Sequence, residues 1–191
     1  EQLSNLVRDF DSYQDKRTGF DDPEDLIRML RGAGVLEFRI AVSSGKAEGV
    51  DVSDLRGQLA KVGPDNTDST AASWFPLNEV NAWADTPAAR ASLREDVQLF
   101  FASNRSLEAA EYDGEYYLLL YDDDARAMTH RGGKKWSVTS AYSSADQFGR
   151  PAVAFRLDTP GGSTMGRLTG AHINDPMAIV LDDQVYTVAN I

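Results

Sequence analysis

The last fifteen residues, MAIVLDDQVYTVANI (177–191), constrain the fold more than any other stretch. Two strand-prone runs flank Asp182 and Asp183, and short polar residues of this kind tolerate the positive φ angles of tight hairpin turns. The stretch therefore predicts an antiparallel hairpin. Its first strand, 177–181, is apolar at every position, so both of its faces need cover, and a hairpin alone cannot provide it. Partner strands and a layer of helices must come from elsewhere.

Composition excludes several classes of protein. The chain has 191 residues, of which 42% are hydrophobic and 26% charged, as expected for a globular protein with a sizeable core. Its net charge of −11 argues against nucleic acid and anionic lipid as partners, because both are bound through clusters of Lys and Arg. The chain contains no cysteine, which excludes disulfides and thiolate metal sites.

Two segments far apart in the chain share a strand pattern. VLEFRIAV (35–42) alternates apolar residues with Glu37 and Arg39, which predicts a strand buried on one face only. AVAFRLD (152–158) repeats the pattern, with Val153, Phe155 and Leu157 expected to point inward. The shared Phe-Arg-Ile and Phe-Arg-Leu motifs suggest that both strands lie in one sheet.

Helical periodicity and capping residues predict three helices near the two ends of the chain. Residues 1–16 place apolar side chains at helical spacing, and residues 22–33 begin with an Asp-Pro start signal and end at glycines. A third helix begins at Thr159 and runs to about His172. Glycines inside this helix each cost about 1 kcal/mol relative to alanine, so tertiary packing must hold it.

The middle of the chain, 44–149, has a different texture. GKAEG and GPDNTDST are typical of loops, 76–84 of a short helix, and Thr86-Pro87 of the start of one longer helix carrying Leu93, Val97, Phe100 and Phe101. Asp113-Gly114 predicts a hairpin turn, and HRGGKKW (130–136) predicts a flexible basic loop. The middle therefore reads as an insertion between two halves of one α/β unit.

Two stretches, DDPEDLIRMLRGAGVLEFRI (21–40) and GRPAVAFRLDTPGGSTMGRLTGAHINDPMAIVLDDQVYTVANI (149–191), resemble the first extracytoplasmic domain of the SecD family, an accessory subunit of the Sec preprotein translocase. The resemblance covers about a third of the chain. In the later stretch the matching positions are Val153, Phe155, Leu157, Gly161, Met165, Leu168, Thr169, Ala178 to Asp182 and Val185.

The chain departs from the family pattern at a few positions. Asn174 and Asp183 stand where the family usually has glycine, and both residue types visit left-handed conformations. Met165 replaces an aromatic residue, and Ala189 replaces a proline near the end of the last strand. The insertion 44–149 does not align with a typical member.

The resemblance implies an α+β fold, with a ferredoxin-like base of sheet and helices that carries an inserted α+β head. Residues 1–20 would form an N-terminal helix or linker, 21–45 and 148–191 the base, and 46–147 the head. In the family, the chain after this hairpin returns with another strand and enters the membrane. The chain is therefore expected to be a piece of a longer protein, attached to the membrane only through segments outside it.

The resemblance also implies a function. The domain would lie on the extracytoplasmic (periplasmic) side of the membrane and assist preprotein translocation by transient binding of emerging polypeptide, without enzymatic activity, cofactor or metal. Its implied partners are unfolded preprotein, SecF and the SecY channel complex, and no nucleic acid. The resemblance further implies that proton-motive force moves the head against the base. The expected hinge residues are Ser43, Ser44, Gly45, Phe148 and Gly149.

Aromatic residues of the insertion are the candidates for binding polypeptide. Most of them must form the core of so small a domain, but a few at the rim of a cleft would grip unfolded chain without demanding a particular sequence. The candidates are Trp74, Trp83, Tyr112 and Trp136.

Two alternatives remain open from the residues alone. One is an extracytoplasmic interaction module that keeps a SecD-like base but uses the head for a different binding task. The other is a carboxylate-dependent hydrolase, which would require Asp122, Asp123 and Asp124 to converge with His130 in a pocket. The three aspartates are also explained as the polar end of an apolar strand, and DNTD (65–68) as an ordinary loop, so neither requires a metal.

Overall fold

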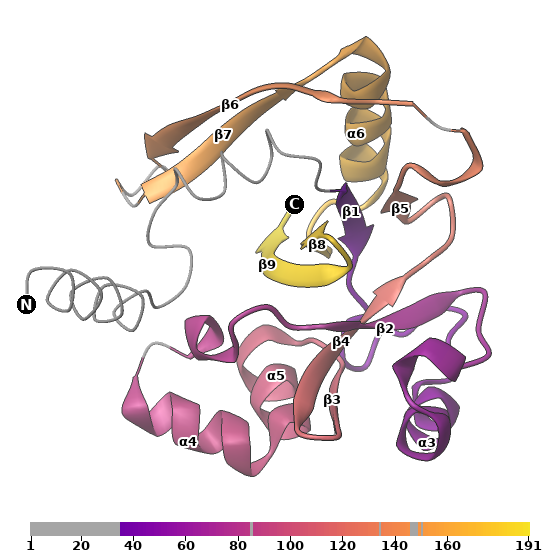
Figure 1. Ribbon diagram of the computed structural model, residues 1–191, viewed down its shortest axis with the longest axis vertical. Coiled ribbons are helices and arrows are strands. Elements are labelled where there is room, and N and C mark those ends of the chain that lie inside the picture. Colours follow the sequence, from indigo (N-terminus) through magenta and orange to yellow (C-terminus); the bar gives the residue numbers. More distant parts are fainter. Residues whose placement is uncertain (1–34, 85, 134, 146–148, 150) are drawn as a thin grey trace, which may run out of the picture.

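The computed structural model describes residues 35–84, 86–133, 135–145, 149 and 151–191. The helices predicted at 1–16 and 22–33 lie outside the described residues. The described chain forms two main sheets, a two-stranded ribbon and helices that cover them (Figure 1). Its mixture of helix and sheet confirms the predicted α+β class.

The first sheet, here called the base sheet, has the strand order β5-β1-β8-β9. These strands are β5 (Ala127–Met128), β1 (Leu36–Ile40), β8 (Pro176–Leu181) and β9 (Gln184–Asn190). β1 is antiparallel to β8, with Phe38 opposite Ile179. Val35 N–H also donates to the carboxylate of Asp182, 147 positions later. The early strand and the final hairpin are therefore neighbours, as predicted.

The final hairpin forms as the sequence predicts. β8 and β9 pair antiparallel, and the two turn residues, Asp182 and Asp183, have φ angles of 49° and 63°. Positive φ at both central positions is the conformation that suits the twist of a two-residue hairpin.

The second sheet, here called the head sheet, has the order β2-β4-β3. It comprises β2 (Ala72–Pro76), β4 (Glu115–Tyr121) and β3 (Ala109–Tyr112). The predicted Asp113-Gly114 turn joins β3 to β4, with φ of 53° and 80°.

Helices cover both faces of the head sheet (Figure 1). Along β4, Tyr117, Leu119 and Tyr121 pack in the same cluster as α3 (Val52–Val62). Leu118 and Leu120 point to the opposite face, in the cluster of α4 (Pro87–Glu95) and α5 (Val97–Arg105). This period of two explains why β4 is apolar at successive positions. α3 was not predicted, although Asp51 caps it and Gly63 ends it.

The helix predicted to begin at Thr86-Pro87 is two helices, so that prediction is wrong in its length. The backbone of Asp96 is extended, with φ −152° and ψ 95°, and its carboxylate accepts the N–H of Leu99 at the start of α5. Because Asp96 has the extended backbone of an N-cap residue, the first helix ends there and a second helix begins. The short helix predicted at 76–84 is reduced to the 3₁₀ turn η2 (Val80–Trp83). Two further 3₁₀ turns are η1 (Pro64–Asn66) and η3 (Arg131–Gly133), the latter within the predicted basic loop.

The remaining elements lie against the base sheet. β6 (Val138–Ala145) and β7 (Pro151–Leu157) form an antiparallel ribbon, followed by α6 (Thr159–Ala171), which confirms the third predicted helix. β7 is not in the sheet of β1, so the prediction of one shared sheet is wrong. The reason is that β7 packs over the face of β1, with the Phe38 and Phe155 rings 5.5 Å apart.

The prediction that β1 is buried on one face only is also wrong, because all five of its residues are buried, Glu37 and Arg39 included. The ferredoxin-like character of the base and the division into base and head at residues 45 and 148 stay predictions. Two strands from within 46–147, β5 and β6, pair with β1 and β7 respectively.

Candidate functional site

The junction between the base sheet and the head sheet contains most of the buried charge among the described residues. One apolar cluster runs across it, since Leu118 and Leu120 of β4 pack in the same cluster as Ala178, Val180 and Val185 of β8 and β9. The two sheets therefore share a core.

Backbone hydrogen bonds reinforce the junction on two sides. After β1 the chain continues beside the head sheet, where Val42 N–H donates to Leu119 O at 2.9 Å and Val42 O accepts from Glu108 N–H at 3.0 Å. On the other side, Asn78 N–H donates to Val185 O of β9 at 2.9 Å. The segment after β1 is therefore hydrogen-bonded to the head sheet, and the segment after β2 is hydrogen-bonded to β9 of the base sheet.

A buried ion-pair network lies at the centre of the junction. Arg39 in β1 is fully buried, and its guanidinium donates to Glu37 at 2.7 and 2.9 Å, to Tyr121 O at 3.2 Å and to Asp122 at 2.5 Å. The guanidinium carbon also lies 4.7 Å from the centre of the Phe75 ring of β2. Arg39 of the base sheet thereby contacts β2 and β4 of the head sheet, and also Asp122, the residue that follows β4.

Asp122 is shared between two arginines. Its carboxylate accepts from Arg39 and from Arg131, the latter at 2.8 and 3.0 Å. Burial acts to raise the pKa of Asp122, but hydrogen bonds and charge attraction from Arg39 and Arg131 outweigh it, and the pKa lies below its ordinary value. Asp122 is therefore ionised at neutral pH.

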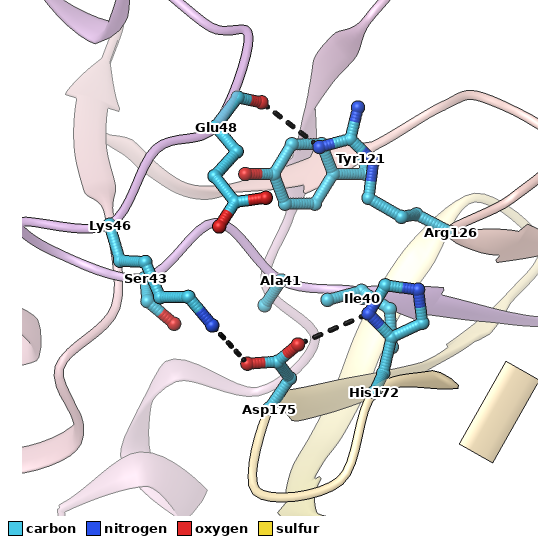
Figure 2. A pocket seen from close by; sticks show the side chains of 9 residues that line it. All are labelled: Ile40, Ala41, Ser43, Lys46, Glu48, Tyr121, Arg126, His172 and Asp175. Carbon is cyan, nitrogen blue, oxygen red and sulfur yellow. Dashed lines mark hydrogen bonds and ion pairs between the residues drawn. The ribbon is translucent and has the colours of Figure 1, made fainter. Parts of the chain in front are cut away.

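A small pocket of about 40 Å³ opens beside this network (Figure 2). Its nine lining residues come from the end of β1, the turn that follows, the β4–β5 segment and the α6–β8 turn. They are Ile40, Ala41, Ser43, Lys46, Glu48, Tyr121, Arg126, His172 and Asp175. This volume holds only a few water molecules, so the pocket is too small for a substrate. Its polar lining residues connect the surrounding turns, and these nine residues are here called the joint.

Asp175 is the centre of that joint. Lys46 donates to one of its oxygens at 3.0 Å, and His172 Nδ1 lies 3.1 Å from the other (Figure 2). Burial acts to raise the pKa of Asp175, but the bonds from Lys46 and His172 lower it below its ordinary value. The hydrogen bond to Asp175 raises the pKa of Lys46. The ion pair therefore joins the turn after β1 to the turn before β8.

Arg126 holds the opposite wall of the pocket. Its guanidinium donates to Glu48 O at 2.9 Å and to Asp123 at 2.7 Å, and it stacks 3.7 Å from the centre of the Tyr121 ring. The turn after β1 is thus tied to β4 as well as to the α6–β8 turn.

The four predicted polypeptide-binding aromatics do not share one cleft. Trp74, Trp83 and Trp136 are buried, and their indole N–H groups donate to Leu55 O, Asn78 O and Thr129 O at 3.3, 3.1 and 3.2 Å. Trp74 and Trp136 belong to one apolar cluster and Trp83 to the other, while Tyr112 packs at the edge of the first. Their role in binding polypeptide stays a prediction.

The predicted hinge residues lie beside the joint where the structure describes them. Ser43 forms isolated bridges with Lys46 and Leu107, and Ser44 N–H donates to Ser106 O at 2.8 Å. Gly45 and Gly149 have φ of 79° and 78° and are exposed. Phe148 lies outside the described residues, and the hinge stays a prediction.

The three successive aspartates do not converge with His130. Asp122 binds Arg39 and Arg131, Asp123 binds Arg126, and His130 stacks on Trp136 with ring centres 4.3 Å apart. Within the described ranges, no group of three or more His, Cys, Asp or Glu side chains is arranged to hold a metal ion.

Sequence reasoning missed Arg39 and Glu37 as junction residues. The available signal was a pair of opposite charges two positions apart in an otherwise apolar strand, since residues two apart share one face. That signal does not reveal which element covers the face.

Comparison with known proteins finds that the chain is similar to one family. A model of the SecDF P1 head subdomain matches residues 129–191. The SecD protein translocase subunit of Rhodobacter capsulatus is 36% identical over 90 residues, which cover 47% of this chain and 15% of that protein. The SecD subunits of Rhodothermus marinus and Anaeromyxobacter dehalogenans are 25% and 26% identical, and each alignment covers 88% of this chain. The chain is therefore similar to SecD translocase subunits, both in residues 129–191 and along most of its length.

The SecD relatives are much longer than this chain, which spans 33% and 31% of the Rhodothermus and Anaeromyxobacter proteins. A crystal structure of SecDF in a super-membrane-facing form aligns with 91% of the chain and 17% of its own length, at 23% identity and a TM-score of 0.33. Among the described residues, no helix is long and apolar enough to cross a membrane.

The matched SecD region, 129–191, carries β6, β7, α6, β8 and β9. The family description calls it a head subdomain, whereas the resemblance to SecD described above implies that 148–191 is part of the base, and that division stays a prediction. In the structure, β8 of this region pairs with β1.

Proposed function

We propose that this chain is an extracytoplasmic, periplasmic domain of a SecD-like protein-export subunit, and that it assists translocation by transiently binding emerging polypeptide. The observation that carries the proposal is the alignment of two SecD translocase subunits along 88% of the chain. The proposed partners are unfolded preprotein and, for the whole subunit, SecF and the SecY channel complex. The domain would bind and move without enzymatic activity.

The junction supports a mechanical role. Arg39 binds Asp122 across the junction, while Arg126 with Glu48 O and Lys46 with Asp175 hold the turn after β1 in place. The Arg39 guanidinium is fully buried, so the loss of a partner is costly, whereas exposed pairs such as Lys46–Asp175 contribute little and break readily. In this proposal the residues around Ser43 to Gly45 allow limited movement, and the buried network sets the resting arrangement.

Transient binding sets the expected affinity. A domain that must bind polypeptide and then release it works best with micromolar or weaker affinity, which corresponds to a binding free energy of about −8 kcal/mol or less favourable. The net charge of −11 favours basic over acidic segments, and salt should weaken that preference because charges are screened over about 10 Å at 0.1 M.

The test is a titration of the 191-residue chain with permanently unfolded peptides of opposite charge, followed by amide chemical shifts. The expected result is saturable shifts with the basic peptide at lower concentration than with the acidic one. If no peptide shifts any resonance at millimolar concentration, direct polypeptide binding by this domain is excluded. The alternative, an interaction module with a SecD-like base and another binding task, then replaces it.

A further inference from the structure

The outer side of the head carries a groove at the elbow between α4 and α5. It has a volume of about 490 Å³ and is lined by both helices, which falls within the range of ligand-binding clefts. The elbow exists because Asp96 ends α4 and caps α5 through the Leu99 N–H at 2.8 Å. The groove is therefore fixed by a capped helix start rather than by a loop.

An exposed leucine lies in this groove. Leu99 is 62% exposed, whereas its neighbour Phe100 is 7% exposed, and both line the groove. The core contacts of α5 come from Val97, Phe100 and Phe101, so Leu99 is not required for packing the helix. It offers apolar surface to a ligand.

The groove is acidic. Glu95 and Asp96 both line it, and the Glu95 carboxylate has no hydrogen-bond or ion-pair partner among the residues that the structure describes. The nearby arginines of α4 are directed elsewhere, since Arg90 donates to Ala84 O at 3.0 Å and Arg94 to Asn81 at 3.5 Å. Negative charge next to exposed apolar surface complements a cation next to an apolar side chain.

We propose that the α4–α5 groove binds an extended polypeptide segment in which an apolar residue is flanked by Lys or Arg. The proposal rests on the proposed function and names where on the domain polypeptide binds. Leu99 and Phe100 contact the apolar side chain, while Glu95 and Asp96 attract the cation. Polar groups on the walls, among them the hydroxyls of Ser92 and Ser103, are available to the backbone of the segment. A single exposed leucine keeps the binding weak and reversible.

The experiment measures binding of two labelled 12-residue peptides to the whole chain by fluorescence anisotropy. Both contain Gly, Ser and Leu, one with four Lys and the other with four Glu in the same places. Leu99→Ser removes the exposed apolar group, and we expect the affinity for the Lys peptide to fall about tenfold. Glu95→Lys reverses one charge, and we expect a fall of about threefold for the Lys peptide, a gain for the Glu peptide, and loss of both effects in 0.5 M salt.

Two control variants lie on the α3 side of the head. Val62→Ser removes another exposed apolar side chain, and Asp65→Lys reverses another exposed charge. Both should leave peptide binding within twofold of the wild type. Asp96 is left unchanged, because it caps α5.

The outcomes separate this inference from the proposed function. If the wild type binds the Lys peptide but Leu99→Ser and Glu95→Lys bind it equally well, the groove is not the site while polypeptide binding by the domain stands. If the wild type binds neither peptide, the proposed function itself fails. If Leu99→Ser abolishes a concentration-dependent dimer, seen by sedimentation, without changing peptide binding, the occupant is a second copy and the inference is overturned.

Discussion

Arg39 in β1 and Asp122 at the end of β4, 83 positions apart in sequence, form a partly buried ion pair between the base sheet and the head sheet. The carboxylate of Glu37 binds the other side of the same guanidinium. Because β1 and β4 belong to different sheets, this cluster fixes how the two sheets sit relative to each other. Its desolvated charges make the junction sensitive to the loss of any one partner.

Replacing Arg39 with Met should destabilise the protein strongly. The substitution keeps much of the volume but leaves Glu37, which is 5% exposed, as an unpaired buried charge. Removing one partner from a buried pair costs about 3–5 kcal/mol. Urea unfolding followed by circular dichroism measures the difference.

Arg131→Met is the matched control, because Arg131 is 61% exposed where it binds the same Asp122. This substitution should cost less than about 1 kcal/mol. Equal losses in the two variants would contradict the central role of Arg39.

Breaking the Lys46–Asp175 pair should loosen the joint without unfolding the protein. Lys46 is 60% exposed in this pair, so Lys46→Met should change the free energy of unfolding by less than about 1 kcal/mol. Hydrogen exchange should nevertheless become faster in the turn 43–48, because one of the contacts that hold this turn is lost. Lys61→Met, at an exposed position in the last turn of α3, is the control and should leave exchange in that turn unchanged.

Acid should weaken the junction. The folded-state pKa values of Asp122 and Asp175 both lie below the ordinary value, so their stabilising contribution is complete above the unfolded pKa of about 3.9. It is lost as pH falls through the lowered folded values, because the unfolded chain then binds more protons than the folded one. Urea unfolding between pH 5 and pH 2.5 should show stability falling with pH. Asp122→Asn should be less stable at pH 6 and show a shallower fall. An unchanged slope would remove Asp122 from the acid response.

Adjacent glycines at the start of α6 should respond oppositely to alanine. A Cβ at Gly161 would lie 2.9 Å from an oxygen of Asp158, the capping residue, and 3.0 Å from Leu157 Cβ. Gly161→Ala should therefore destabilise by about 1–3 kcal/mol through overpacking. A Cβ at Gly162 meets nothing within 4 Å, so Gly162→Ala should stabilise by about 0.5–1 kcal/mol through helix propensity. Thermal unfolding of both variants tests the pair, and a shift of the same sign in both would refute it.

Relief of strain in the last turn should stabilise the hairpin. Asp183 has φ 63°, a left-handed conformation that glycine adopts without penalty, so Asp183→Gly should stabilise by about 0.5–1 kcal/mol. Asp182→Gly is the comparison: it also relieves a positive φ, but it loses the carboxylate that accepts Val35 N–H at 2.8 Å. Its gain should be smaller or negative. Chemical denaturation ranks the two variants.

Local elements whose signals lie within a few residues were predictable from the chain alone. Asp113-Gly114 and Asp182-Asp183 specify their turns through the φ angles these residues tolerate, and the Asp158-Thr159-Pro160 start specifies α6. The resemblance of 149–191 to the SecD family was equally available, because it depends on the order of residues along the chain.

Which surfaces meet could not be predicted in this way, because it depends on how distant segments pack. The alternation of β1 predicted an exposed polar face, yet the head sheet covers that face and converts Glu37 and Arg39 into a buried network with Asp122. The same holds for β7, whose Phe155 stacks over Phe38 although its strand pairs only with β6. Periodicity reports which side chains share a face of one strand, whereas burial depends on long-range packing that no local pattern encodes.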